Sequence, residues 1–314
     1  MLKRQNLDSS HADVRSVPVD VLCVGHASYD LTFSVSRHPE ADEKTTASAF
    51  VSCGGGPAAN AAVVVTRLGR KSAFAGYLSN DVFGEWHMRE LEQAGVDCRL
   101  IVRGEAPSPL STVLVKPDGQ RALVNYRQSD PLPEESIDFS NLHPEVILFD
   151  GHEPHISQSL AARARSQGIP TVLDAGSLHA GTEALMTRVD YLVCSEKFAR
   201  QFSGQADTGK SLDLLSSHAP NVVITLGESG IVWKREGMKG NLPAFKVDAV
   251  DTTGAGDAFH GAFAAALAEG LPWLDILRLA SAVAALSCAG LGARSSLPTR
   301  ENVNLLLSNN HLTY

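Results

Sequence analysis

Short apolar runs rich in β-branched residues recur along the chain and alternate with segments that have helical spacing. The clearest runs are VDVLCVG (19–25), VILFD (146–150), TVLD (171–174), YLVC (191–194) and VVITLG (222–227). Helical patterns lie between them, such as residues 157–167, which end before Gly-Ile-Pro. Apolar strands that alternate with helices are typical of a parallel sheet covered on both faces. The pattern predicts an α/β fold whose ligands bind beyond the carboxyl ends of the strands.

Two segments depart from this alternation. Residues 31–52 and 108–128 are richer in Thr, Ser, Val and charged residues, and their apolar runs are shorter. Within the second, TVLVKPDGQRALVNY predicts a hairpin with Pro-Asp-Gly at its turn. The two segments could pair into a small sheet that projects from the main domain. Composition leaves open whether such a sheet is a flap over an active site or only an edge of the fold.

The composition is that of a globular protein without membrane spans. The chain has 314 residues, of which 44% are hydrophobic and 20% charged, and its mean hydropathy is -0.04. It has no run of about 18 apolar residues, so no membrane-spanning helix is expected. The polar N-terminus lacks the apolar stretch of a secretory signal, and we expect residues 1–18 to form a flexible leader.

Charge and cysteine usage exclude several classes of function. The net charge is -8 and the pI about 5.8, without a basic stripe, which argues against nucleic acid or anionic membranes as partners. The cysteines are scattered and form no CxxC pair, so neither a zinc site nor a disulfide framework is predicted. We expect inert thiols, mostly buried, and a cytoplasmic location.

Residues 204–211, GQADTGKS, match the P-loop expression GxxxxGK followed by Ser or Thr. A P-loop binds phosphate only where it leaves a buried strand and opens a helix. Here the preceding SEKFARQF places Phe198 and Phe202 at helical spacing, and the strand YLVC ends a whole helix earlier. We therefore predict that this segment links two helices and binds no nucleotide.

A stronger candidate is DTTGAGD (251–257), which stands directly before a helical pattern. The backbone N–H groups of Gly254, Ala255 and Gly256 can converge on an anion at the helix N-terminus. Asp257 would place a carboxylate beside that anion, where it could take a proton from an attacking hydroxyl. An ordinary helix cap is the alternative, and the residues alone leave the two open.

Two further features suit a polar ligand. GGGPAAN (54–60) opens another helix, and its glycines would let a ligand approach the backbone closely, although a flexible hinge is the alternative. Its last residue, Asn60, can both donate and accept hydrogen bonds. Asp30 lies just beyond the first strand, where its carboxylate could bind paired hydroxyls of a polyol.

Together these motifs make the chain resemble the ribokinase-like (PfkB) carbohydrate kinase family, from about Val19 to Pro298. The signatures that carry the resemblance are GGGPAANAAVVVTRLG and VDTTGAGDAFHGAF, in this order. The resemblance implies a doubly wound, mostly parallel sheet with helices on both faces and a small β-sheet lid. It assigns residues 19–30, 53–107 and 129–314 to the kinase core and residues 31–52 and 108–128 to the lid.

The implied activity is ATP-dependent phosphorylation of a sugar hydroxyl by in-line transfer. By resemblance, Asp257 is the catalytic base, and the amides of Gly254, Ala255 and Gly256 form the anion hole. The implied sugar-binding residues are Asp30, Gly55, Gly56 and Asn60, with Asn125 and Arg127 as candidates for the far end of the sugar. The implied nucleotide-binding residues are Thr225, Gly227 and Gly230, together with Gly254 and Gly256.

The resemblance also implies metal ions. A monovalent cation, for which potassium is suited, is expected at Asp251 and Thr253, and its further candidate ligands are Ser287, Gly292 and Ser296. Mg²⁺ would accompany ATP. The NxxE motif that helps to organise Mg-ATP in many relatives is altered here, because Ser195 replaces Asn and Phe198 replaces Glu. Glu196 is the candidate to act in its place through water.

The stretches GGGPAANAA, LVNYRQSDPLP and FKVDAVDTTGAGDAFHGA are most similar to the sulfofructose kinase and ketohexokinase branch. We therefore expect a ketohexose or a related sugar as substrate. An anionic tail would call for a guanidinium fork, which the loop after residue 150 lacks, and Glu153 in that loop would repel an anion. A neutral sugar is favoured, and sulfofructose stays open.

Alternative functions follow from the same residues. A nucleoside kinase of the adenosine or pseudouridine type could stack a base on Phe33, Phe50 or Tyr126 of the lid, and the altered NxxE motif suits a sugar-sensing protein on a kinase scaffold. A dinucleotide-dependent dehydrogenase is rejected, because GHASYD at the first βα turn contains no GxGxxG. Sugar and ATP are the expected partners, and lid-mediated dimers are common in relatives, so we expect a homodimer.

Overall fold

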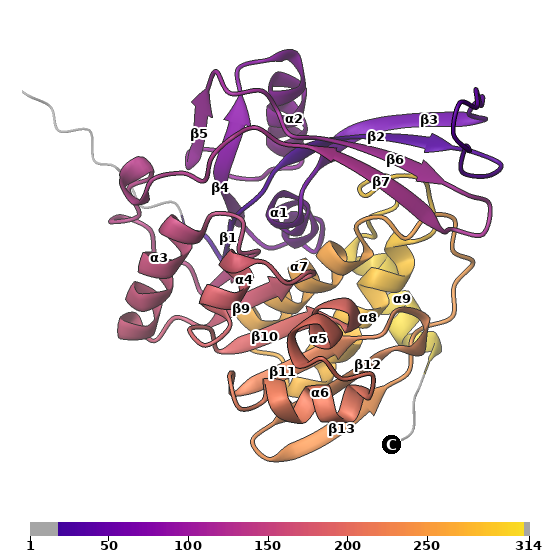
Figure 1. Ribbon diagram of the computed structural model, residues 1–314. Helices are drawn as coiled ribbons and strands as arrows, with labels where there is room; N and C mark the ends of the chain where they lie inside the picture. The colour runs from indigo at the N-terminus through magenta and orange to yellow at the C-terminus, as the bar shows by residue number, and fades with distance from the viewer. Residues whose placement is uncertain (1–17, 311–314) are drawn as a thin grey trace, which may run out of the picture.

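The computed structural model describes residues 18–310, and the predicted leader lies outside them apart from Pro18. Within this range, a nine-stranded sheet in the order β13-β12-β11-β10-β9-β8-β1-β4-β5 forms the centre of the molecule (Figure 1). All neighbouring strands from β11 to β5 are parallel, and β12 and β13 add an antiparallel hairpin at one edge. The predicted mostly parallel α/β sheet is confirmed.

The strands of this sheet are β1 (Val21–Val24), β4 (Ser72–Ser79), β5 (Ile101–Gly104), β8 (Val146–Phe149), β9 (Thr171–Ala175), β10 (Tyr191–Ser195), β11 (Asn221–Thr225), β12 (Ile231–Arg235) and β13 (Met238–Leu242). The five apolar runs singled out in the sequence supply β1, β8, β9, β10 and β11. β1 shows why such strands are apolar throughout. Val21 and Cys23 pack into the core on one face of the sheet, whereas Leu22 and Val24 pack into the core on the other.

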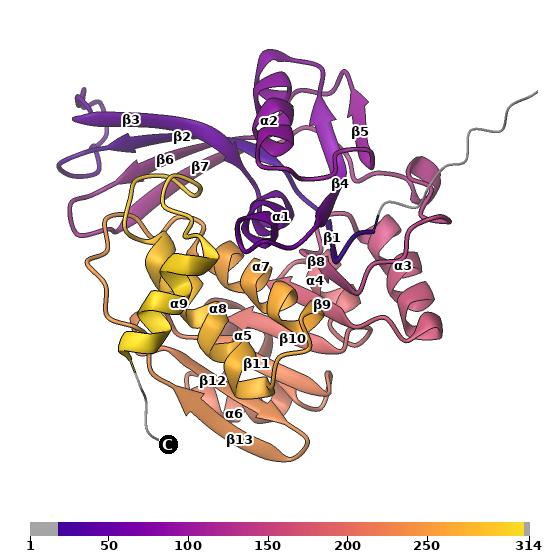
Figure 2. The same cartoon turned by 180° about the vertical axis from the view of Figure 1, so that it is seen from behind.

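The helices are α1 (Pro57–Arg67), α2 (Val82–Gln93), α3 (Pro154–Gln167), α4 (Ala180–Leu185), α5 (Glu196–Ser203), α6 (Thr208–Leu215), α7 (Ala255–Ala268), α8 (Trp273–Ser287) and α9 (Arg300–Asn309), and the short 3-10 turns are η1 (Glu134–Ser136) and η2 (Gly227–Ser229). Helices α1, α2, α7, α8 and α9 pack on one face of the sheet, and α3 to α6 pack on the other (Figures 1 and 2). None of these helices is long and apolar enough to cross a membrane.

A second sheet of four strands projects from the main sheet (Figure 2). Its order is β3-β2-β6-β7, with β2 (Ser28–Ser34), β3 (Ala49–Gly55), β6 (Leu110–Val115) and β7 (Arg121–Tyr126). β2 pairs in parallel with β6, so the predicted pairing of two remote segments is confirmed. The predicted hairpin is β6 and β7, and Gly119 at its turn has φ +76°, a conformation that favours glycine. We call this sheet the lid.

The strand order reverses around β1, which lies between β4 and β8. In open α/β sheets, ligands bind at such a switch point, beyond the carboxyl ends of the strands. The chain leaves β1 directly into lid strand β2, and lid strand β3 leads directly into α1. The connections therefore bring the lid and the N-terminus of α1 together at this edge of the sheet.

Candidate active site

The DTTGAGD segment forms the N-terminus of α7. Gly254 is the residue before the helix and has φ +78°, and a Cβ there would lie 2.8 Å from the Cβ of Ala293. Its backbone conformation and its close packing thus both require glycine. The first N–H groups of a helix have no acceptors within it, and they carry the positive end of the helix dipole. The amides of Gly256 and Asp257 at this end can therefore receive an anion.

Asn60 and Asp257, 197 residues apart in the sequence, meet in the structure: Asn60 Nδ2 donates to Asp257 Oδ2 at 2.7 Å. Two glycines make this approach possible. Gly56 precedes α1 with φ +93°, and a Cβ there would lie 2.5 Å from the carbonyl oxygen of His26. A Cβ at Gly261 in α7 would lie 2.7 Å from a backbone oxygen of α1, so glycine lets the two helices pack closely. The two motifs singled out in the sequence thus form one site.

Asp30 lies on lid strand β2, buried, and Ser28 Oγ donates to its Oδ1 at 2.9 Å. Burial raises the pKa of this carboxyl, while hydrogen bonds and the charge of Arg294 oppose the rise. A Cβ at Gly55 would lie 2.2 Å from Asp30 Oδ2, so only glycine leaves room for this side chain. Asp30 is in register with Ser111 of β6, and Ser111 with Asn125 of β7, so three polar side chains form a row across the lid.

One central residue of this site, Arg294, was not among the residues predicted from the sequence. Its side chain is only 9% exposed. Nε donates to Asn60 Oδ1 at 2.8 Å, Nη1 to Glu90 Oε2 at 3.3 Å and Nη2 to His87 Nε2 at 2.8 Å. Glu90 Oε2 also accepts the N–H of Gly54 at 2.7 Å. Helix α2, which carries His87 and Glu90, is thereby tied to the GGGPAAN motif and, through Asn60, to Asp257.

Asp150 connects three segments of the chain at the switch point of the sheet. Its Oδ2 accepts the N–H groups of His26, at 2.7 Å, and Ala58, at 3.1 Å, and its Oδ1 accepts the N–H of His152 at 2.9 Å. One carboxylate therefore joins the loop after β1, the first turn of α1 and the loop after β8. A Cβ at Gly25 would lie within 2.3 Å of this carboxylate, which explains the glycine that ends the first strand.

Three imidazole rings form a row beyond β1, β8 and β9. The ring centroids of His26 and His152 are 5.0 Å apart, and those of His152 and His179 are 4.7 Å apart and stacked. Arg127, directly after lid strand β7, places Nη1 3.4 Å from His152 Nδ1. Burial holds the pKa values of His26 and His179 below the usual range, and neighbouring His152 and Arg127 add to this. We call these three histidines, together with Arg127, the histidine row.

Glu153 lies beside the histidine row and is 2% exposed. Its Oε2 accepts the N–H of Leu132 at 2.6 Å, and Arg127 Nη2 lies 3.5 Å from its Oε1. Burial raises the pKa of Glu153 to about 7, against the opposing influence of that N–H and of Arg127.

Another buried acid, Asp174 near the end of β9, lies beneath the first turn of α7. His260 of α7 places Nδ1 3.1 Å from Asp174 Oδ2 and 2.6 Å from the carbonyl oxygen of Gly256, while its Nε2 donates to the carbonyl of Val193 at 3.0 Å. Burial raises the pKa of Asp174, and His260 opposes the rise. The pair thus fixes the start of α7 against the strands below it.

The predicted nucleotide-binding residues lie at the carboxyl end of β11. Thr225 ends the strand, and Gly227 is exposed in η2 with φ +59°. Gly230 is buried instead, where a Cβ would lie 2.1 Å from the carbonyl oxygen of Leu242. Close packing therefore explains why residue 230 is a glycine. Gly227, in contrast, lies on the surface, where a nucleotide could reach it.

The altered NxxE segment is a capped helix start. Ser195 Oγ accepts the N–H of Phe198 at 3.0 Å, and Phe198 is fully buried in the core. Glu196 is 38% exposed and forms an ion pair of 2.7 Å with Arg200. Ser195 therefore caps the helix and Phe198 packs in the core. Glu196 is the carboxylate that stands between these two positions.

Three of the residues predicted at the monovalent cation site lie together. Asp251 Oδ1 accepts from the N–H and Oγ of Thr253, at 2.9 and 2.7 Å, and Oδ2 accepts the N–H of Gly292 at 2.8 Å. A carboxylate has about four lone-pair positions, so one stays available for a cation. Ser287 Oγ donates to a carbonyl within α8 at 2.8 Å, and Ser296 Oγ lies against Gly290.

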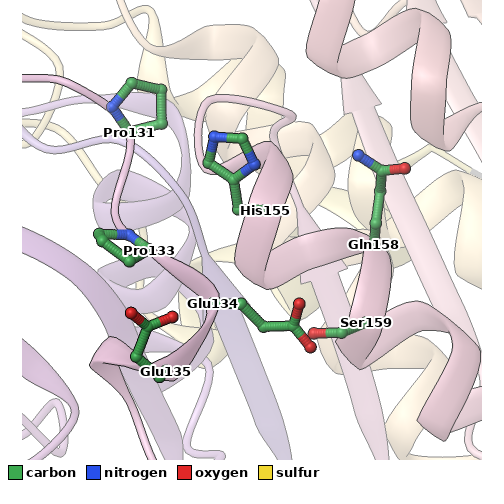
Figure 3. Close-up of a pocket in the computed structure, with 7 residues that line it drawn as sticks. All are labelled: Pro131, Pro133, Glu134, Glu135, His155, Gln158 and Ser159. Carbon is green, nitrogen blue, oxygen red and sulfur yellow. The ribbon is translucent and has the colours of Figure 1, made fainter.

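A separate pocket of about 530 Å³ opens between η1 and the start of α3 (Figure 3). Glu134, Glu135 and His155 are among its lining residues, and in the described chain no lysine or arginine lines it. An acidic lining does not suit a triphosphate. The DTTGAGD end of α7 is the better candidate for the phosphate site.

Comparison with known proteins agrees with this geometry. The sequence profile described as "pfkB family carbohydrate kinase" matches residues 19–300. The chain belongs to the PfkB family of carbohydrate kinases.

This PfkB kinase is 28% identical to the ribokinase of Bacillus subtilis (strain 168) over 294 residues, which cover 92% of this chain and 99% of that protein. It is 29% identical to the probable fructokinase-4 of Arabidopsis thaliana, over 84% of this chain and 90% of that one. Ribokinase from Thermotoga maritima matches the structure with a TM-score of 0.81 and 28% identity, over 93% and 100% of the two chains. Arabidopsis thaliana ribokinase complexed with ribose and ATP matches with a TM-score of 0.81 and 25% identity, over 93% and 99%.

Proposed function

We propose that this kinase transfers the γ-phosphoryl group of Mg-ATP to a hydroxyl of a small neutral sugar, a ketohexose in the first place, with Asp257 as the catalytic base. The observation that carries the proposal is the 2.7 Å hydrogen bond between Asn60 and Asp257 at the N-terminus of α7. It joins a residue that can bind a sugar hydroxyl to a carboxylate at an anion site. A hydroxyl bound between the two would lie beside the phosphoryl group that it attacks.

The residues suggest how the reaction proceeds. Asn60 occupies Asp257 Oδ2, which leaves Oδ1 to accept the proton of the attacking hydroxyl. The hydroxyl oxygen forms a bond to the γ-phosphorus while the bond from that phosphorus to the β,γ-bridging oxygen breaks, and ADP leaves. The amides at the start of α7 stabilise the charge on the transferred group. Asp30 and Asn125 on the lid orient the other hydroxyls.

The same proposal includes the nucleotide and its metal ions. Thr225 and Gly227 lie where they could contact the nucleotide, which is also the ligand named with the Arabidopsis ribokinase. Mg²⁺ supplies charge neutralisation of the phosphates when bound, and Glu196 is the carboxylate within the altered motif, residues 195–198. Asp251, Thr253 and Gly292 are proposed to hold potassium through the remaining lone pair of Asp251 and backbone oxygens.

The histidine row supports a neutral sugar over an anionic one. His26 and His179 have lowered pKa values and are therefore neutral near pH 7, so they can donate and accept hydrogen bonds but add no positive charge. The guanidinium of Arg127 already has neighbours within the protein, because it lies 3.4 Å from His152 Nδ1 and 3.5 Å from Glu153 Oε1. Such a surface suits hydroxyl groups better than a sulfonate or phosphate.

Phosphoryl transfer assays with Mg-ATP and potassium would test this proposal. We expect the highest kcat/KM with one neutral ketose, and lower values with sulfofructose, fructose phosphates, ribose and nucleosides. Asp257→Asn should lower kcat by about 1,000-fold or more while sugar binding is retained, because base and alignment are lost together. Substantial turnover by Asp257→Asn would remove Asp257 as the base. A preference for nucleosides would instead support the nucleoside kinase.

We also propose that the kinase is a cytoplasmic homodimer that pairs through the lid. Large apolar side chains are exposed on lid strands β3 and β7: Phe50 (55%), Leu123 (46%), Val124 (70%) and Tyr126 (43%). β7 is an edge strand, and an exposed apolar edge is a surface that proteins usually cover. A second copy of the lid would cover it.

A further inference from the structure

We propose that Arg294 is a positioning residue for catalysis: it fixes the amide of Asn60 so that this amide holds Asp257 in its working orientation. The inference rests on the proposed role of Asp257 as the base. It concerns a residue outside both sequence signatures, in the loop between α8 and α9.

The hydrogen-bond chemistry allows one orientation of Asn60. A guanidinium only donates hydrogen bonds, so the atom of Asn60 that faces Arg294 Nε at 2.8 Å must be the carbonyl Oδ1. The amide Nδ2 is then turned to Asp257 Oδ2, where it donates. Without Arg294, Asn60 Oδ1 would lose its donor, and the amide would be free to swing away from the carboxylate. Asp257 would lose its donor and its fixed orientation.

Arg294 is itself held on its far side by α2. Its Nη2 donates to His87 Nε2, so this imidazole carries its proton on Nδ1. Burial and the charge of Arg294 hold the pKa of His87 well below its usual range, which keeps Nε2 free to accept. Nη1 donates to Glu90. The guanidinium thus has three acceptors in different directions, and its position is fixed before any sugar binds.

The backbone leaves room for this arrangement. A Cβ at Gly54 would lie 2.4 Å from Arg294 Nη1 and 2.3 Å from the ring of His87. The first glycine of the GGGPAAN motif therefore makes room for the arginine fork. On the other side, Ala293 packs against Gly254, so the loop that carries Arg294 touches the start of α7.

Charge alone does not account for the arrangement. Arg294 carries a positive charge near the carboxylates of Asp30, Glu90 and Asp257, and a lysine would keep that charge. A lysine ammonium, however, carries its three N–H donors on one nitrogen and lacks the planar fork, so it cannot reach Asn60, His87 and Glu90 in the same geometry. Arg294→Lys therefore separates the positioning of Asn60 from simple electrostatics.

The test is a double-mutant cycle with Arg294→Lys and Asn60→Ala. Arg294→Lys should lower kcat by about 100-fold, as expected for a misplaced catalytic group, with little change in KM for ATP. In the Asn60→Ala background, the same substitution should cost less than about threefold, because Arg294 acts through Asn60. The matched control is Arg300→Lys, which disrupts a bidentate ion pair with Glu269 and should leave the kinetics unchanged. Independent, multiplicative effects of the two substitutions would overturn the inference.

A second variant tests the inference even if Arg294→Lys does not fold. Asn60→Asp keeps an acceptor for Arg294 but replaces the donor to Asp257 with a carboxylate. We expect a similar loss of kcat, measured below the melting temperature, which the repulsion between the buried carboxylate at position 60 and Asp257 should lower. Wild-type kcat in Asn60→Asp would overturn the inference. If Asp257→Asn is inactive while Arg294→Lys is fully active, only the inference fails. If Asp257→Asn stays active, the proposed role of Asp257 as the base fails, and the inference fails with it.

Discussion

Among single residues, Glu153 gives the clearest prediction about pH. Its pKa is about 7 in the folded protein, against an ordinary value of 4.5. The folded protein therefore favours the protonated carboxyl of Glu153. The contribution of this group to the free energy of unfolding is lost as the pH rises from about 4.5 through about 7. Glu153→Gln keeps an oxygen for the N–H of Leu132 but cannot ionise. We expect it to become more stable than the wild type over this range, by up to about 3 kcal/mol above pH 7.

Urea denaturation of both proteins at several pH values between about 5 and about 8 would measure this difference. The difference in unfolding free energy should grow with pH and become constant above about 7. A difference that stays the same at every pH would show that Glu153 does not titrate in this range.

A second prediction at this scale concerns Gly54. Gly54→Ala places a methyl group 2.4 Å from the guanidinium of Arg294 and 2.3 Å from His87, which are both fixed by their partners. We expect a loss of about 1–3 kcal/mol of stability, as for other overpacked sites, and a lower kcat. Gly209→Ala, whose Cβ would meet only the side chain of Asp207 at 3.2 Å, is the control and should keep full activity. Thermal unfolding and steady-state kinetics measure both effects.

The residues of the site differ in how far the sequence predicted them. Asn60 and Asp257 stand in glycine-rich motifs that open helices, and local chemistry suggested both. His87, Glu90 and Arg294 come from an ordinary helix and a loop, and their importance arises only when the fold brings them together. Arg294 carried one weak signal, since it is the single charged residue in the small-residue run AGLGARSS.

At the scale of elements, the P-loop-like segment (residues 204–211) shows that the flanking secondary structure decides what a matching motif forms. Gly204 ends α5 with φ +65°, and the side chain of Asp207 caps α6 by accepting the N–H of Lys210 at 2.8 Å. The predicted link between two helices is confirmed. Because Lys210 is exposed in the first turn of α6, away from α7, Lys210→Ala should leave KM for ATP within about twofold of the wild type. A tenfold rise in that KM would show that this segment binds the nucleotide after all.

Helix boundaries were predicted less well than helix existence. The sequence pattern suggested a helix that GGGPAAN (54–60) opens and a helix over 157–167, whereas α1 begins at Pro57, inside that motif, and α3 at Pro154. In both cases a proline occupies the first turn, where its missing N–H costs nothing, and it extends the helix beyond its apolar pattern. The lid was harder still, because a sheet formed by two remote segments depends on which strands pair, and composition does not specify that.

At the scale of the whole molecule, the lid exposes large apolar side chains, and we expect a second protein surface to cover them. The lid lies at the opposite end of the molecule from β13 (Figure 1), and its outer strands carry Val124 and Phe50, both more than half exposed. A stable dimer usually buries about 800 Å² per partner around an apolar centre. A charge placed at Val124 would have to be buried without a partner, at a cost of several kcal/mol. We expect Val124→Asp to shift the kinase from dimer to monomer.

Sedimentation of wild type and variant across a range of concentrations would measure the shift. Met238→Asp is the matched control, because Met238 is 56% exposed on β13, far from the lid, and it should leave the assembly unchanged. The lid carries Asp30 and Asn125 as well, so loss of the dimer should raise KM for the sugar more than KM for ATP. A wild type that is monomeric at every concentration would remove the lid dimer, and it would leave the site within one chain, where Asn60, Asp257 and Arg294 already meet.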